Sequence, residues 1–183
     1  GTPSPTFQWR KDGVAIAGAT GASLTLGSIA LADAGSYTVV ATNLLGSATS
    51  PAATITFPPT IIAQPVGLTV NEGAAATFTV TASSTAPLTY VWMKAFPDTI
   101  ESSGATGTTS ATLTLPRTVP SDAGSYVVRI GNSAGFVTSN PAVLVVNSRP
   151  TITTHPLGRV FTAGESVSLA VVAAGPPPLT YQW

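Results

Sequence analysis

Apolar and polar residues alternate along several short stretches of the chain, which is the pattern of half-buried β-strands. The clearest stretch is residues 77–82, where Phe78, Val80 and Ala82 alternate with three threonines. Similar alternation occurs at residues 6–10, 23–26, 113–115 and 142–146. Gly, Pro, Asn and Asp lie between these stretches and predict turns. The pattern therefore predicts an all-β protein built of short strands.

One five-residue segment occurs twice, first at Asp33–Tyr37 and again at Asp122–Tyr126. The two occurrences are 89 residues apart (122 minus 33), which is the length of a small domain. The tryptophans Trp9, Trp92 and Trp183 recur at related intervals of 83 and 91 residues. The chain is therefore predicted to be a tandem array.

Proline-bearing segments divide this array into three copies. Copy 1 is residues 1–57, copy 2 is residues 58–146 and copy 3 is residues 147–183. Copy 2 is predicted to be a complete domain, copy 1 to lack its first two strands, and copy 3 to hold only the first strands. Short linkers restrict bending, so we expect a semi-rigid rod. The incomplete copies are expected to associate between chains through exposed apolar faces.

Four segments resemble successive signatures of an immunoglobulin I-set domain. They are Gly164–Leu169, Trp9–Gly13, Leu24–Leu26 and Asp33–Tyr37. The resemblance covers nearly the whole chain and implies tandem immunoglobulin-like Greek-key β-sandwiches, one complete domain flanked by two partial ones. Since the chain has no cysteine, it resembles the immunoglobulin-like repeats of large bacterial surface and secreted proteins more than animal receptors.

The resemblance also implies which residues form the core of copy 2. Val80 and Val128 occupy the two positions where the family usually carries its inter-sheet cysteines. A native disulfide is worth about 2–5 kcal/mol, whereas burying each valine contributes roughly 1.5–3 kcal/mol, so an apolar pair packed against Trp92 can replace it. Tyr126 is expected to bond the backbone upstream and Asp122 to cap that turn. The predicted structural core is Val80, Trp92, Leu113, Leu115, Asp122, Tyr126 and Val128.

Charged residues make up only 8% of the chain, and seven cations balance seven anions to give no net charge. Nucleic acid is an improbable partner, because phosphate binding needs clustered cations. No apolar run approaches the ~20 residues of a membrane span, so this segment is not expected to insert into a membrane. The expected partners are other domains of the same parent chain, with protein or glycan ligands at a cell surface as further candidates.

Candidate catalytic chemistry is sparse. His155 is the only histidine, lies beside Pro156 on a predicted edge strand, and is expected to be a solvated residue. The aspartates Asp33 and Asp122 recur with the repeat and do not form a pair. Motifs for nucleophilic serine, phosphate-binding loops, zinc and calcium are absent from the sequence. The sequence therefore predicts a protein that is not an enzyme and has no cofactor, no metal and no catalytic residue.

Two functions remain open at this point. The first is a structural or adhesion spacer module of a larger extracellular or cell-surface protein, a location that the family resemblance implies. The alternative is a carbohydrate-binding accessory module of a secreted enzyme, which needs exposed aromatic rings. Alternation assigns Phe7, Trp9, Tyr90, Trp92, Tyr181 and Trp183 to the interior. This leaves Phe96 and Phe136 as the candidate glycan contacts.

Overall fold

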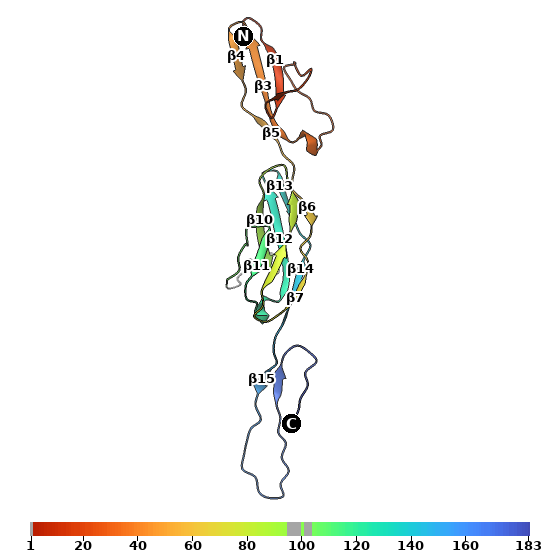
Figure 1. The fold of residues 1–183 in the computed structure, drawn as a ribbon, viewed down its shortest axis with the longest axis vertical. Helices are drawn as coiled ribbons and strands as arrows, with labels where there is room; N and C mark the ends of the chain where they lie inside the picture. The colour runs from red at the N-terminus through yellow and green to blue at the C-terminus, as the bar shows by residue number, and fades with distance from the viewer. Residues whose placement is uncertain (1, 95–99, 101–103) are drawn as a thin grey trace. The chain divides into compact units, whose positions relative to one another are not determined.

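A computed structural model describes residues 2–94, 100 and 104–183. The chain is built from β-strands and two short 3-10 helices, η1 (Leu31–Asp33) and η2 (Pro120–Asp122) (Figure 1). It divides into two compact units, which are described in turn. The first contains residues 1–63, 81–90 and 129–139, and the second contains residues 64–80, 91–128 and 140–183. Within the described residues, no helix is long and apolar enough to cross a membrane.

The first unit contains a five-stranded antiparallel sheet formed by copy 1, in the order β2-β1-β3-β4, with β5 also paired to β3. Its strands are β1 (Thr6–Lys11), β2 (Val14–Ala15), β3 (Gly35–Asn43), β4 (Gly46–Thr49) and β5 (Ala53–Ile55). Trp9 lies opposite Val39 in the β1/β3 register. Tyr37 is the buried residue of this sheet, with 5% of its surface exposed.

The same unit holds one end of copy 2. There β6 (Thr60–Ala63) pairs with β9 (Thr81–Ser83), and β13 (Gly135–Thr138) pairs with the last residues of β12 (Gly124–Asn132). The β12/β13 hairpin has a two-residue loop between Asn132 and Gly135, as does the β3/β4 hairpin between Asn43 and Gly46. Asparagine precedes and glycine follows each loop, and both residue types favour turns.

The second unit contains most of the copy 2 sandwich. One sheet has the order β10-β12-β14-β7, and the other pairs β11 with β8. These strands are β7 (Leu68–Asn71), β8 (Ala76–Thr79), β10 (Thr89–Lys94), β11 (Thr112–Leu115) and β14 (Ala142–Asn147). The β7/β14 pair is parallel, whereas the other pairs are antiparallel. Burial alternates along β8 and β11, as a sandwich with one face inward requires, whereas β10 and β12 also bury Met93 and Val127 at outward positions.

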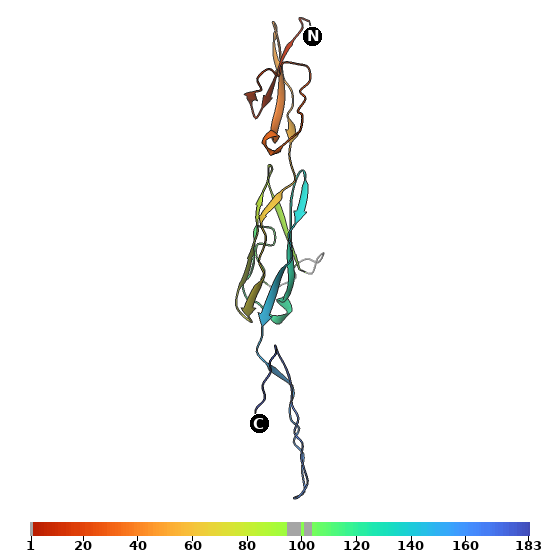
Figure 2. The same cartoon turned by 90° about the vertical axis from the view of Figure 1, so that its right-hand side faces the viewer.

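Copy 3 contributes one short antiparallel pair to the second unit, β15 (Thr151–Thr154) with β16 (Val172–Ala174). Residues 155–171 form an extended excursion beyond this pair, seen in blue in Figure 2. Val167 and Leu169, which belong to the Gly164–Leu169 signature, lie outside regular strands and are 55% and 49% exposed. Their counterparts in β8, Ala76 and Phe78, are buried against the opposing sheet of copy 2, and the described part of copy 3 has no such sheet.

Two further expectations from alternation need correction. Residues 23–26 do not form a strand. They match β11 of copy 2, whose partner strand is β8, and copy 1 contains no counterpart of β8. The inward aromatic pair predicted for copy 3 is exposed, with Tyr181 at 55% and Trp183 at 76%. The aromatics Phe7, Trp9 and Tyr90 are half-buried. Alternation marks the face of a strand, but burial also needs an opposing sheet.

Candidate functional site

All seven predicted core residues of copy 2 lie in the interior of the second unit. Each has 5% or less of its surface exposed, and Leu113, Tyr126 and Val128 have none. The ring of Phe78 lies 5.0 Å from that of Tyr126 and 6.2 Å from that of Trp92, measured between centroids. The indole nitrogen of Trp92 donates a 2.9 Å hydrogen bond to the carbonyl oxygen of Ser110. This interior is therefore a packed aromatic and aliphatic cluster whose polar indole atom is satisfied.

Hydrogen bonds that involve Asp122 hold the turn before β12. The hydroxyl of Tyr126 donates to the Asp122 carbonyl oxygen at 2.7 Å, and the backbone NH of Val119 donates to the Asp122 carboxylate at 2.8 Å. Burial, followed by the nearby negative charge of Asp122, raises the pKa of Tyr126 to about 12. Burial and the Asp122 charge therefore keep the Tyr126 phenol neutral, so that it can donate its hydrogen bond. The role of this pair is structural.

Copy 1 repeats this turn in a less buried setting. The hydroxyl of Tyr37 donates to the Asp33 carbonyl oxygen at 2.8 Å, and the backbone NH of Ala30 donates to the Asp33 carboxylate at 2.8 Å. The repeated five-residue segment thus encodes the same pair of hydrogen bonds twice. Its recurrence reflects a folding requirement and not a shared reaction site.

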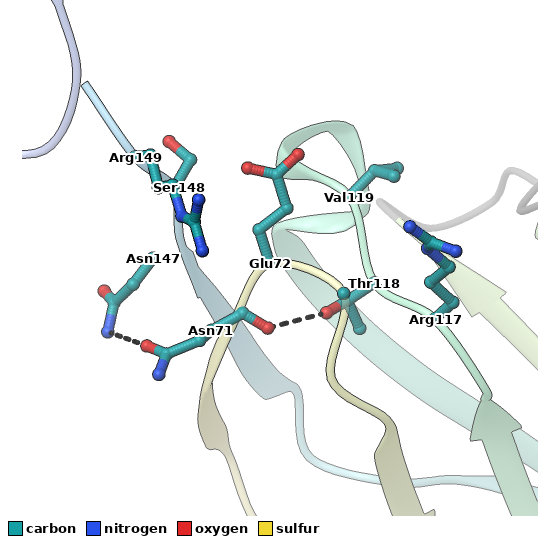
Figure 3. Close-up of a pocket in the computed structure, with 9 residues that line it drawn as sticks. Asn71, Glu72, Arg117, Thr118, Val119, Asn147, Ser148 and Arg149 are labelled. Carbon is teal, nitrogen blue, oxygen red and sulfur yellow. Dashed lines mark hydrogen bonds between the residues drawn. The ribbon is translucent and has the colours of Figure 1, made fainter. Parts of the chain in front are cut away.

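A polar pocket of about 580 Å³ lies in the second unit, where three segments come together after β7, before η2 and after β14. Its lining residues are Asn71, Glu72, Gly73, Arg117, Thr118, Val119, Asn147, Ser148 and Arg149 (Figure 3). In this view the Glu72 side chain stands between Arg149 and Arg117. Thr118 is fully buried, and its hydroxyl donates to the Ala74 carbonyl oxygen at 2.9 Å. Sequence reasoning treated residues 147–150 as a boundary and missed this pocket, because its walls come from distant segments.

The pocket can hold a polar group but lacks the parts of a catalytic site. It offers one carboxylate, on Glu72, and two guanidinium groups, and its lining contains no histidine or cysteine. Among the residues that the structure describes, no group of three or more His, Cys, Asp or Glu side chains is placed to hold a metal ion. His155 directly follows β15 in the sequence and is exposed. It does not line this pocket.

The two candidate glycan contacts have different outcomes. Phe96 lies outside the described residues. Phe136 is 59% exposed, but the guanidinium carbon of Arg129 lies 3.7 Å from its ring centroid. Such a cation–π contact occupies one face of the ring, which is the surface that a sugar would stack on. No feature of the described residues therefore favours carbohydrate binding over the other function.

Comparisons with known proteins identify the fold of both longer copies. Residues 58–132 match the family described as Immunoglobulin domain, and residues 1–55 match the Immunoglobulin I-set domain. The I-band fragment I67-I69 from titin aligns with a TM-score of 0.61 and 23% identity, covering 97% of this chain and 68% of that chain. At this identity the structural likeness shows the fold alone.

Relatives among curated proteins are animal proteins. The chain is 33% identical over 169 residues to the basement membrane-specific heparan sulfate proteoglycan core protein of Mus musculus, covering 88% of this chain and 4% of that protein. It is 27% identical over 191 residues to Roundabout homolog 2 of Homo sapiens, covering 100% of this chain and 14% of that protein. Protein sax-3 of Caenorhabditis elegans is 28% identical over 193 residues, covering 100% of this chain and 15% of that protein.

The chain spans only a small fraction of each of these relatives. The resemblance to bacterial surface and secreted proteins that the missing cysteines favoured is not supported, because these relatives come from mouse, human and nematode. The β-sheets, the repeated Asp-to-Tyr turn and the two family matches agree: the chain is an all-β protein made of tandem immunoglobulin-like domains.

Proposed function

We propose that this chain is a non-catalytic structural and adhesion spacer of a larger extracellular or cell-surface multidomain protein, with other domains of the same parent chain as its partners. The family matches and the animal relatives support this proposal. One of these relatives is named as a basement membrane-specific core protein. In this proposal residues 58–146 act as a complete domain, and residues 1–57 and 147–183 are portions of its neighbours in the array.

The observation that carries the proposal is how the linker before copy 2 is held. The side-chain amide of Asn132, in the β12/β13 hairpin, donates to the Phe57 carbonyl oxygen at 2.7 Å. The backbone NH of Phe57 donates in turn to the Thr85 hydroxyl at 3.0 Å. Pro59 is buried, and Pro58 lies beside Gly135. Both polar backbone groups of Phe57 are therefore bound to loops of copy 2.

A linker held in this way has few free torsions. Strand β5 ends at Ile55 and β6 begins at Thr60, so only residues 56–59 connect them. Two of these four are prolines, whose φ angles are fixed by their rings. A spacer needs this stiffness, because a flexible linker would let adjacent domains fold back and would not hold a distance.

The test is the width of the distance distribution between copies 1 and 2. Because the chain has no cysteine, Ser47→Cys with Thr79→Cys introduces two unique sites for spin labels on exposed strand positions. Electron spin resonance on the full chain should give a narrow distribution that Asn132→Ala broadens. Asn43→Ala is the matched control, since Asn43 makes the same hairpin contact within copy 1 but does not touch Phe57. A broad distribution in the unmutated chain would refute the spacer role.

A further inference from the structure

The two junctions of the array can be compared position by position, because the same kind of strand pair follows each of them. Thr60 pairs with Ser83 in β6/β9, and Thr151 pairs with Ala174 in β15/β16. Both differences equal 91 residues (151 minus 60 and 174 minus 83), and the two pairs have a register shift at the same place. At this offset, residues 56–59 of the first junction match residues 147–150 of the second, and residues 83–85 match residues 174–176.

Side-chain hydroxyls that follow β9 hold the first junction. The Thr85 hydroxyl accepts the 3.0 Å hydrogen bond from the backbone NH of Phe57. The Ser84 hydroxyl accepts a 2.8 Å hydrogen bond from the side-chain amide of Asn132, and the same amide donates to the Phe57 carbonyl oxygen at 2.7 Å. Thr85 therefore binds the linker directly, and Ser84 positions the amide that binds it from the other side.

Copy 3 has no hydroxyl at the matching positions. Where copy 2 has Ser83, Ser84 and Thr85, copy 3 has Ala174, Gly175 and Pro176. None of these three side chains can donate or accept a hydrogen bond. The backbone NH of Ser148, which is the counterpart of Phe57, therefore has no side-chain acceptor at position 176. Copy 3 does not contain the β12/β13 hairpin, so the comparison rests on these loops, which both copies contain.

The strands that follow the two junctions differ in the same direction. In β6/β9 the hydroxyls of Thr60 and Ser83 lie 2.9 Å apart. In β15/β16 the Thr151 hydroxyl donates instead to the Ala174 carbonyl oxygen at 3.5 Å, which is longer than the roughly 2.5–3.0 Å of an ordinary O–H···O bond. The start of copy 3 is therefore held by weaker polar contacts than the start of copy 2.

Packing around the two linkers also differs. Pro59 is buried, whereas its counterpart Pro150 is exposed. Ser148 and Arg149 line the open polar pocket of about 580 Å³, so unfilled space lies beside both residues (Figure 3). Length does not account for the difference, because the second linker is the shorter one, with three residues between β14 and β15 against four between β5 and β6.

Free rotation at the second junction is confined to a short segment. The backbone NH of Glu72 donates to the Asn147 carbonyl oxygen at 2.7 Å, which secures the chain up to the end of β14. Strand β15 begins at Thr151, so residues 148–150 lie between the two secured ends. Only Pro150 among them has a φ angle fixed by its ring. Hinges between domains are typically a few residues at the ends of elements, as here.

We propose that residues 148–150 are a hinge between copy 2 and copy 3, whereas residues 56–59 are a stiff joint. The difference comes from the loop after the second strand of each pair, which carries hydroxyls in copy 2 and none in copy 3. This inference rests on the proposed spacer role and adds to it. The spacer holds a fixed arrangement at its first junction and bends at its second.

The experiment compares the width of the distance distribution across the two junctions, measured by electron spin resonance on the full chain. Spin labels at Ser47→Cys with Thr79→Cys span the first junction, and labels at Thr79→Cys with Thr154→Cys span the second, all at exposed strand positions. The second distribution should be at least about twice as broad as the first, because its linker lacks the anchoring bonds.

Two substitutions test the cause of this difference. Pro176→Thr supplies the hydroxyl that Thr85 carries in copy 2 and should narrow the second distribution. Pro177→Thr is the matched control, since it makes the same chemical change at the next position, whose counterpart Ala86 has no side chain that could bind the linker. Thr85→Val keeps the shape of the side chain, removes the hydroxyl and should broaden the first distribution.

Two results would overturn the hinge. These are a second distribution as narrow as the first, and equal effects of Pro176→Thr and Pro177→Thr on its width. The continuous-wave spectrum of the label at position 154 reports local motion and should be the same with and without Pro176→Thr. A change in that spectrum would assign the narrowing to the strand and also overturn the hinge.

The outcomes separate the hinge from the spacer role. Two narrow distributions leave the spacer role intact and refute the hinge alone. A broad distribution across the first junction refutes the spacer role itself, and with it the contrast between the two junctions.

Discussion

The phenol of Tyr126 and the backbone carbonyl of Asp122 form a 2.7 Å hydrogen bond at a position with no solvent access to the tyrosine. The tyrosine ring also stacks on Phe78, with centroids 5.0 Å apart. One side chain therefore ties the turn before β12 to the packing between the two sheets.

We expect alkaline pH to destabilise copy 2 through Tyr126. Its pKa is raised from the ordinary value of 10.0 to about 12, first by burial and then by the Asp122 charge. Between these two values the unfolded state loses its proton while the folded state keeps it. Stability is therefore complete below pH 10 and falls by about 2–3 kcal/mol as the pH rises to 12. A spectrophotometric titration should show one tyrosine ionising late, and Tyr126→Phe should remove that component; if the component remains in the variant, the assignment to Tyr126 is wrong.

Asp122→Ala should destabilise copy 2 more than Asp33→Ala destabilises copy 1. Each substitution removes the carboxylate that accepts a backbone NH, from Val119 in one case and Ala30 in the other. The Asp122 carboxylate is buried and its bond to the Val119 NH is part-buried, so water replaces that acceptor less readily, at a cost of about 1–3 kcal/mol. At the more open Asp33 site water can replace the carboxylate. Thermal unfolding of both variants checks this order, and equal losses would contradict it.

Trp92→Ala should cost about 3–5 kcal/mol, because it empties the space beside Phe78 in a fully packed interior. The matched control is Trp183→Ala, which removes the same side chain where it is 76% exposed and should change stability by less than about 0.5 kcal/mol. Denaturant unfolding followed by circular dichroism measures both. A similar loss in the two variants would mean that the core does not centre on Trp92.

Replacing Val80 and Val128 together by cysteine should give a disulfide. Both valines are buried, at 3% and 0% exposure; Val80 lies between β8 and β9, and Val128 lies in β12 of the other sheet. The family places its inter-sheet bridge at these positions, and a bridge there should add about 2–4 kcal/mol by restricting the unfolded chain. Thiol titration of the folded, oxidised variant measures the outcome. Two free thiols per chain would show that the two β-carbons lie too far apart.

The architecture of copy 2 could be predicted from sequence because its signals agree with each other. Alternation around Phe78 and Trp92 marks the inner faces, and the repeated Asp-to-Tyr segment marks the turn before β12. Burial follows that alternation in β8 and β11, where an opposing sheet covers one face, whereas β10 and β12 bury Met93 and Val127 as well. The turns after Asn43 and Asn132 also have a local sequence signal, because asparagine and glycine flank both two-residue loops.

Other features depend on tertiary context that no local pattern contains. Leu24 and Leu169 have the same alternation as their copy 2 counterparts, but each lacks the strand that would pair with it, and neither lies in a strand. The polar pocket and the Asn132 contact to Phe57 join residues far apart in sequence.

The parallel pairing of β7 with β14 has a mechanical consequence. Leu68–Asn71 lies early in copy 2 and Leu144–Asn147 lies at its end, and the two strands run side by side in the same direction. Tension applied through the chain pulls the first strand toward its N-terminus and the second toward its C-terminus. The two strands must then slide past each other, so all of their hydrogen bonds carry the load at once instead of opening one after another. A domain whose first and last strands pair in parallel should resist stretching along the chain far better than its modest number of paired residues suggests.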